Sequence, residues 1–230
     1  MKIGVLKFFA VTLVVALVLS VAGCSGGGGG SSSGSSAAAS SSGGGNKGPF
    51  KQGSLVVAYK LNANGTRDIN TTTHTTDGRG HFSFSSIPWS GATEFVISGE
   101  YLNENTGTYM TMPANPGLSA IVDLSSGSSS DVNINILTNI AAKKIKHDMN
   151  ATGASVATAK AQAQDDIEEL FNLDLGSGVE LEDLDLTDGT NNVKANTQLL
   201  RISSALLDTA NPQQVMEQIA TDMTDGSLDD

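Results

Sequence analysis

The sequence predicts an α+β fold in which an antiparallel β-sandwich comes first and a small bundle of helices follows. Residues 47–136 alternate apolar and polar side chains with a period of two, and turn signals such as Asp77-Gly78 separate the alternating segments. After Ile136 the apolar spacing changes to three and four residues, the period of an amphipathic helix. Because the two patterns do not interleave, the sheets and the helices should segregate.

About seven short strands are expected in the sandwich. The segment 81–85 is the clearest, because Phe82 and Phe84 alternate with polar residues and should both enter the core. The Thr-rich segment 67–76 is mostly polar, which suits an edge strand or a solvated strand. The expected strands are 53–60, 67–76, 81–85, 93–102, 109–112, 118–124 and 131–136.

Four helices are expected after the sandwich, packed on each other and over one end of the sheets. Thr138 is a candidate cap for the first helix. Asn211-Pro212 combines a capping residue with a first-turn proline and predicts the start of the last one. The expected helices are 138–149, 155–172, 192–208 and a segment that begins at 212.

The first 23 residues have the layout of a secretory signal. Lys2 and Lys7 give a positively charged start, and residues 8–22 form an uncharged run. The end of this run, Val21-Ala22-Gly23-Cys24, resembles the lipobox of bacterial lipoproteins. The resemblance implies cleavage before Cys24, a lipid on its sulfur, and usually an acyl chain such as palmitate on its new amino group.

Two other interpretations of the N-terminus stay open. A transmembrane helix needs about 20 apolar residues, which is more than the roughly 15 present before Gly23. A signal that is cleaved without lipidation is the second alternative. The lipobox pattern favours the lipoprotein over both, so the membrane, reached through a lipid anchor, is the first expected partner.

Lipidation of Cys24 would also limit the chemistry of the chain. Cys24 is the only cysteine, so no thiol would remain for a disulfide, a thiolate metal site or a nucleophile. Ser25, rather than Asp, follows the cysteine. In enterobacterial lipoproteins an Asp at that position often signals inner-membrane retention, so the resemblance implies the cell outer membrane.

The tract after the cysteine consists almost entirely of Gly, Ser and Ala up to residue 46. Such a segment has too little apolar surface to offset the entropy lost on ordering. We therefore expect a flexible tether there. The predicted organisation is a signal peptide at 1–23, a lipidated cysteine and tether at 24–46, a sandwich at 47–136 and a helical module at 137–230.

One motif in the sandwich carries a family resemblance. The run Thr76-Asp-Gly-Arg-Gly-His-Phe-Ser-Phe84 resembles the T-D-x-x-G-x-F-x-F signature of carboxypeptidase regulatory-like domains. These domains have a transthyretin-like sandwich, and the resemblance covers about residues 48–136. The segments 135–145 and 159–171 resemble the helical region that comes after such a domain in a group of uncharacterised bacterial lipoproteins. Regulatory-like domains bind, space or stabilise, and they bring no catalytic residues.

Composition narrows the choice of partner. The net charge of −11 argues against nucleic acid and anionic headgroups, both of which attract basic surfaces. Aromatic residues make up only 5 % of the chain, which lowers the expectation of a carbohydrate-binding platform. Trp89, Tyr101 and Tyr109 are nevertheless candidate contacts for a glycan or peptidoglycan. Trp89 fits equally well as a plug at the end of the core.

Two groups of residues have the chemistry of metal ligands. One is a His-Asp-His set around a hairpin turn, whose spacing matches no zinc motif; its members are His74, Asp77 and His81. The other is weakly similar to a calcium loop and comprises Asp183, Asp185 and Asp188. Counted from Asp183, glycine falls at position seven and lysine at twelve, whereas an EF-hand needs glycine at six and glutamate at twelve. An acidic linker is the stronger interpretation.

The sequence contains no G-x-S-x-G elbow, H-E-x-x-H helix or phosphate-binding loop. We therefore expect no enzyme and no cofactor. The pattern favours a non-catalytic, lipid-anchored envelope protein that acts as an adhesion, assembly or scaffold module, with an envelope protein or glycan as partner. The alternatives are a glycan- or peptidoglycan-binding module and an accessory subunit of a surface enzyme.

Overall fold

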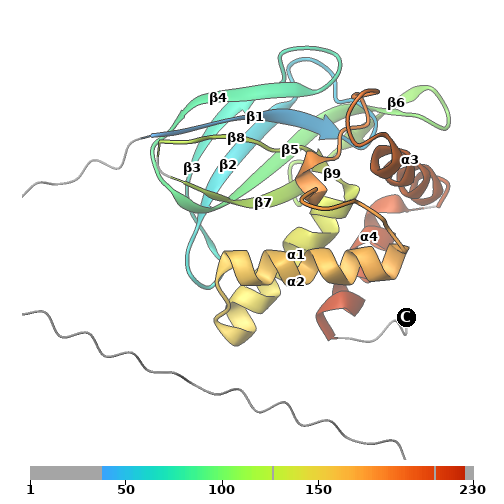
Figure 1. Cartoon of the computed structure of the whole chain (residues 1–230). Coiled ribbons are helices and arrows are strands. Elements are labelled where there is room, and N and C mark those ends of the chain that lie inside the picture. The colour runs from blue at the N-terminus through green and yellow to red at the C-terminus, as the bar shows by residue number, and fades with distance from the viewer. Residues whose placement is uncertain (1–37, 126, 210, 226–230) are drawn as a thin grey trace, which may run out of the picture. The chain divides into compact units, whose positions relative to one another are not determined.

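The computed structural model describes residues 38–125, 127–209 and 211–225. Strands come first along the chain and helices follow, which confirms the predicted α+β class (Figure 1). The strands are β1 (Ala39–Asn46), β2 (Leu55–Leu61), β3 (Arg67–His74), β4 (His81–Ile87), β5 (Gly91–Asn103), β6 (Thr108–Met112), β7 (Leu118–Leu124), β8 (Ser129–Asp131) and β9 (Ile134–Asn135). The helices are α1 (Ile136–Thr152), α2 (Val156–Phe171), the short 3₁₀ helix η1 (Leu181–Asp183), α3 (Val193–Leu207) and α4 (Pro212–Asp225).

The strands form two sheets. One has the order β4-β1-β8, with β9 also paired to β1, and the other has the order β3-β2-β5-β6, with β7 also paired to β5. The long strand β5 changes partner along its length, because residues 91–97 pair with β7 and residues 99–103 pair with β6. Gly99, at the change, has φ 134°, and a Cβ there would lie 2.6 Å from Ser54 Oγ.

The two sheets pack face to face through aromatic rings. Phe84 of β4 lies 5.7 Å from Phe95 of β5 between ring centroids, and Phe82 lies 6.3 Å from the same ring. Both β4 rings are buried, which confirms the alternation read from the sequence. The polar strand β3 ends its sheet and is mostly exposed, so the expectation of an edge strand is also confirmed.

The predicted tether is wrong for residues 39–46. These residues form β1, which pairs antiparallel with β4 and parallel with β8 and β9. Its glycines fit because neighbouring atoms come very close: a Cβ at Gly43 would lie 1.9 Å from the Val132 carbonyl oxygen, and one at Gly45 would lie 2.4 Å from Ile97 Cδ1. Backbone pairing and close approach thus hold a segment that has little apolar surface.

The junction of the sandwich and the helices also differs from the prediction. The expected strand 131–136 is divided into β8 and β9, and α1 already begins at Ile136. Asn135, not Thr138, caps this helix, because its side chain accepts hydrogen bonds from the backbone N–H groups of Leu137 (2.9 Å) and Thr138 (3.0 Å). Thr138 completes a capping box by accepting from Asn135 N at 2.9 Å.

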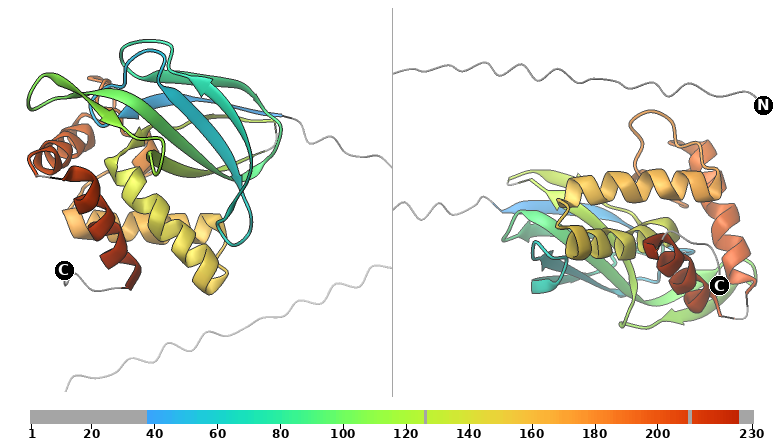
Figure 2. Two further views of the ribbon diagram at one scale, coloured as in Figure 1. Left: turned by 180° about the vertical axis from the view of Figure 1, so that it is seen from behind. Right: turned by 90° about the horizontal axis from the view of Figure 1, so that it is seen from below.

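The helices gather on one side of the strands, as Figure 2 shows, and a buried ion cluster joins them to the sheet. Glu94 of β5 is fully buried and accepts hydrogen bonds from Arg67 Nε of β3 and Lys146 Nζ of α1, each at 2.7 Å. Burial raises the pKa of Glu94, but the two cations outweigh it and the pKa is lowered. This carboxylate therefore stays charged and ties α1 to two strands.

Candidate functional site

Two adjoining hollows beside β8 have linings that are rich in carboxylates. Their volumes are about 440 Å³ and 330 Å³, and both are lined by Asp131 of β8 and Asp183 of η1. We call them together the acidic groove. Its carboxylates are Asp123, Asp131, Glu180, Glu182, Asp183, Asp185 and Asp188. Lys160 and His81 are the basic side chains in the same lining.

Lys160 of α2 organises the inner end of the acidic groove. It donates to Glu180 Oε2 at 2.6 Å and also to Glu182 Oε1. Burial raises the pKa of Glu182 to about 7, against the opposing effect of the Lys160 ammonium. Burial by itself would lower the pKa of Lys160, but the two carboxylates raise it. Lys160 therefore stays charged, and Glu182 is the group at this end that titrates near neutrality.

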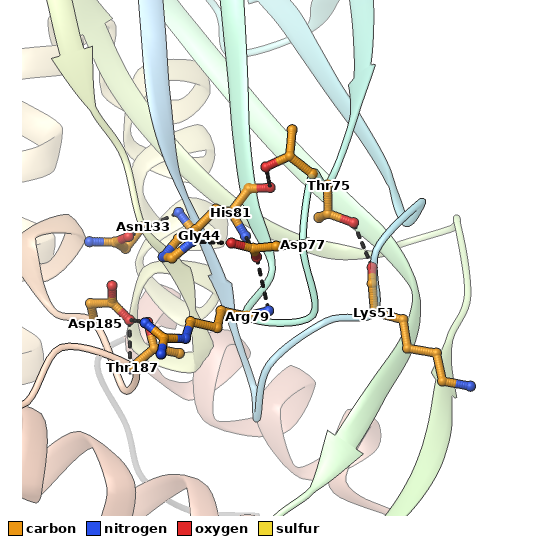
Figure 3. A network of polar contacts seen from close by, with 10 residues as sticks. Gly44, Lys51, Thr75, Asp77, Arg79, His81, Asn133, Asp185 and Thr187 are labelled. Carbon is orange, nitrogen blue, oxygen red and sulfur yellow. Dashed lines mark hydrogen bonds and ion pairs between the residues drawn. The ribbon is translucent and has the colours of Figure 1, made fainter.

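The strands supply the other wall of the acidic groove. Asp131 accepts a hydrogen bond from Ser42 Oγ of β1, and Asn133 Oδ1 accepts from Gly44 N at 3.0 Å. Further along, His81 Nδ1 lies 2.7 Å from Asp77 Oδ2, as Figure 3 shows. This places the turn of the T-D-x-x-G motif next to the groove.

The motif turn is closed by its own carboxylate. Asp77 Oδ1 accepts from Arg79 N at 2.9 Å and from His81 N at 3.2 Å, which is the usual behaviour of Asp in a tight turn. Its slight burial raises the pKa of Asp77, but these hydrogen bonds and the one from His81 lower it overall. The turn predicted at Asp77-Gly78 is therefore confirmed.

The outer end of the acidic groove is a loop whose carboxylates brace the backbone. Asp185 Oδ1 accepts from Thr187 N at 2.7 Å, and Asp188 Oδ1 accepts from Thr190 N at 2.7 Å. The hydrogen bonds from Thr190, with others from Asn191, lower the pKa of Asp188. Asn196 of α3 holds the loop through its Oδ1, which accepts from Asp185 N at 2.9 Å.

The structure brings the three calcium candidates to one groove but not into a metal site. Asp183 Oδ2 accepts from Glu180 N at 2.8 Å, so it caps η1, and Asp185 and Asp188 bind their own loop as described above. Within residues 38–125, 127–209 and 211–225, no group of three His, Cys, Asp or Glu side chains has the arrangement to hold a metal ion. His74, the last residue of β3, therefore belongs to no such metal-binding group either.

The predicted aromatic contacts do not form one surface. Trp89 is buried, with its Nε1 donating to Thr93 Oγ1 at 3.0 Å, and Tyr101 is buried with its ring 5.6 Å from Phe50. Only Tyr109 is exposed, at 52 %, and Lys51 Nζ lies 4.0 Å from its ring centroid. The prediction that Trp89 and Tyr101 are contacts for a glycan is therefore wrong, because both side chains are buried, and the core-plug interpretation of Trp89 is confirmed.

Lys160, Glu180 and Glu182 were not among the site residues predicted from the sequence. Their charges are visible in the sequence, but Lys160 lies on the polar side of a helix where a solvated lysine is ordinary. The groove arises only when α2, η1 and β8 meet in space. A cue was available in the density of carboxylates between 180 and 188, which the sequence interpretation assigned to an acidic linker.

The predicted lipobox, Val21, Ala22, Gly23 and Cys24, lies outside the described residues. Within the part of the chain that the structure describes, no helix combines the length and the apolar character needed to cross a membrane. No protein-family model, curated protein or solved structure matches this chain.

Proposed function

We propose that the chain is a non-catalytic, lipid-anchored module of the bacterial outer membrane that serves in assembly or as a scaffold by holding a basic segment of a partner protein. The anchor follows from the lipobox resemblance and the membrane location from Ser25 after Cys24. The acidic groove is the single observation that carries the choice of partner.

The acidic groove favours a cationic partner by simple charge balance. It contains seven acidic side chains, of which Glu182 titrates near neutrality, against one lysine and one histidine, and Lys160 is already paired with Glu180 and Glu182. Asp123, Asp131 and Asp183 are exposed along its length. Such a concentration of negative charge in a hollow raises the association rate and selects for Lys- or Arg-rich segments. Anionic glycans and nucleic acids are repelled by the same field.

The sandwich supports an accessory role. We propose a transthyretin-like sandwich of the carboxypeptidase regulatory-like type, because the T-D-x-x-G-x-F-x-F motif forms a tight turn followed by two core phenylalanines, Phe82 and Phe84. In this proposal the sandwich positions the groove and the helices complete it. The glycan alternative gains no comparable support, since Tyr109 is the one exposed aromatic side chain among the three candidate residues.

The test is cross-linking in cells that produce the full-length tagged protein, followed by purification from outer-membrane fractions and mass spectrometry. The groove variant is Asp123→Lys/Asp131→Lys. Its matched control is Asp68→Lys/Asp165→Lys, which makes the same charge change at exposed positions on β3 and α2. Circular dichroism verifies that both variants fold.

We expect one protein partner with the wild type and the control, and loss of that partner with the groove variant. The purified wild-type and control chains should bind a synthetic Lys/Arg-rich peptide, and the groove variant should not. This binding should weaken as the salt concentration rises. Equal capture by both variants would contradict a groove-based function. Recovery of glycan or peptidoglycan with no protein would contradict the proposal and support the glycan-binding alternative.

A further inference from the structure

A separate hollow of about 240 Å³ lies between β6 and the first turn of α4. Lys47, Tyr101 and Gln213 contribute polar groups to its lining, and Met110, Met112 and Pro212 contribute apolar surface. We call it the Lys47 pocket. It shares no lining residue with the acidic groove, and its lining includes no carboxylate although the chain as a whole carries a charge of −11.

Lys47 is the unusual group in this pocket. It follows β1 directly and is only 1 % exposed. Its Nζ is 4.0 Å from Met216 Sδ, a weak acceptor, and 5.7 Å from the Tyr101 ring centroid. Burial lowers the pKa of Lys47 to about 8, and the nearby charge of Glu104 only partly opposes this. Buried lysines normally pair with an oxygen acceptor, so this ammonium lacks its usual partner.

Gln213 has a similar deficit. Its amide Nε2 and Oε1 are both buried, and neither has a hydrogen-bond partner. Two unsatisfied atoms on one side chain are rare in folded proteins and call for an explanation. Because Gln213 and Lys47 line the same pocket, a single bound acceptor can satisfy the Lys47 ammonium and the Gln213 Nε2.

The remaining walls define what kind of molecule that is. Pro212 and Gln213 of the first turn of α4 line the pocket together with Asn211, which precedes the helix, and the N-terminus of a helix favours negative charge. Met110 and Met112 of β6 provide a flexible apolar wall that adapts to small shapes. The pocket volume suits a compact organic molecule rather than a polymer.

We infer that the Lys47 pocket binds a small organic carboxylate with a short apolar body. The carboxylate accepts hydrogen bonds from Lys47 Nζ and from Gln213 Nε2, and the apolar body contacts Met110 and Met112. This site does not depend on the proposed docking function, because the two hollows are lined by different residues.

The experiment uses the full chain in detergent and three probes that share a four-carbon body. Sodium butyrate carries the carboxylate, butylammonium chloride carries the opposite charge and 1-butanol carries none. Thermal unfolding is followed by the fluorescence of Trp89, the only tryptophan, at constant ionic strength. Butyrate should raise Tm by at least about 2 °C at high excess, and the other two should not.

Variants separate a binding role from a structural role. Lys47→Met should abolish the butyrate shift yet raise the ligand-free Tm, since it removes a buried charge that has no oxygen partner. Lys51→Met, at an exposed lysine paired with Glu100, should leave the butyrate shift intact. If Lys47→Met does not fold, Gln213→Leu serves in its place, because it removes the unpartnered amide in the first turn of α4.

Two results would overturn the inference. One is a butyrate shift no larger than that of 1-butanol or butylammonium in the wild type. The other is a butyrate shift of full size in Lys47→Met or, where that variant does not fold, in Gln213→Leu.

Discussion

Strands β1 and β5 both have neighbours on either side and contribute buried residues, but they are held by different physical effects. β5 contains Phe95 and Ile97, which are fully buried, and gains its stability from apolar surface removed from water. β1 consists of Ser and Gly between Ala39 and Asn46, and the neighbours of its glycines Gly43 and Gly45 approach too closely for larger side chains. A strand with little apolar surface can thus be as well fixed as an apolar one when its backbone is paired and its neighbours leave no room.

The largest expected effect is a loss of stability when the apolar strand β5 is changed. Phe95→Ala should lower the free energy of unfolding by about 3–5 kcal/mol, because the ring contacts both Phe82 and Phe84 across the sandwich. Urea denaturation followed by Trp89 fluorescence measures this. Tyr109→Ala, at an exposed ring, should stay within about 0.5 kcal/mol. If Phe95→Ala lowered the free energy of unfolding as little as Tyr109→Ala, β5 would not be held by its aromatic contacts.

β5 also differs from β1 in that it carries a buried charge, the carboxylate of Glu94. Glu94→Gln should cost about 1.5–3 kcal/mol at neutral pH, because it removes a charge bonded to Arg67 and Lys146. The pKa of Glu94 is lowered in the folded state, so its contribution is complete above the ordinary pKa of 4.5 and is lost as the pH falls through the folded-state pKa.

Denaturation curves collected from pH 7 to pH 3 test this dependence. The difference between wild type and Glu94→Gln should shrink towards acid pH. Glu100→Gln is the control, because Glu100 also pairs with a lysine but is 52 % exposed, and it should cost less than about 1 kcal/mol. Parallel pH profiles for wild type and Glu94→Gln would contradict the prediction.

Adding a methyl group to β1 should destabilise the protein, just as truncating a buried side chain of β5 should. Gly43→Ala should destabilise the protein by about 1–3 kcal/mol, since the new methyl group would overlap the Val132 carbonyl and separate β1 from the segment before β9. Gly78→Ala is the matched control, because nothing lies within 4 Å of its Cβ position. Equal stabilities of the two variants in urea would show that β1 tolerates expansion.

The smallest expected effect has the opposite sign. Ser41 of β1 is buried and its Oγ has no hydrogen-bond partner, so Ser41→Ala should stabilise the protein by about 1 kcal/mol. Ser203→Ala is the contrasting variant, because Ser203 Oγ donates to Glu104 Oε1 at 2.9 Å and its removal should destabilise by about 1 kcal/mol. Thermal unfolding of both variants gives the comparison, and a loss of stability in Ser41→Ala would contradict it.

The same contrast explains how far the sequence could predict the fold. The strands of the second sheet lie within two residues of their expected bounds, because apolar alternation and turn residues mark them. β1 was missed because periodicity measures apolar side chains, whereas this strand depends on pairing with residues about 89 positions away, as at Ser42 and Asp131. The first helix was predicted to within three residues at each end, but its cap was not, since Asn135 lay inside an expected strand.

The candidate sites show the same limit. The carboxylates of the acidic groove were visible at 183–188, but their arrangement with Lys160 depends on how α2 packs against η1. Lys47 and Gln213 are 166 positions apart in the sequence and line one pocket only because the start of α4 lies near β6. No local pattern indicates a pocket of that kind.

The position of β1 has a mechanical consequence. A pulling force applied to Ala39 along the axis of β1 would act on a strand that is bonded to β4 on one side and to β8 and β9 on the other. The load is shared as shear across all of these hydrogen bonds at once, so they do not open one after another like a zipper. Forced unfolding depends on the rate of barrier crossing, and this geometry slows it. A pull along this axis should therefore meet more resistance than a pull that peels β1 away from one end.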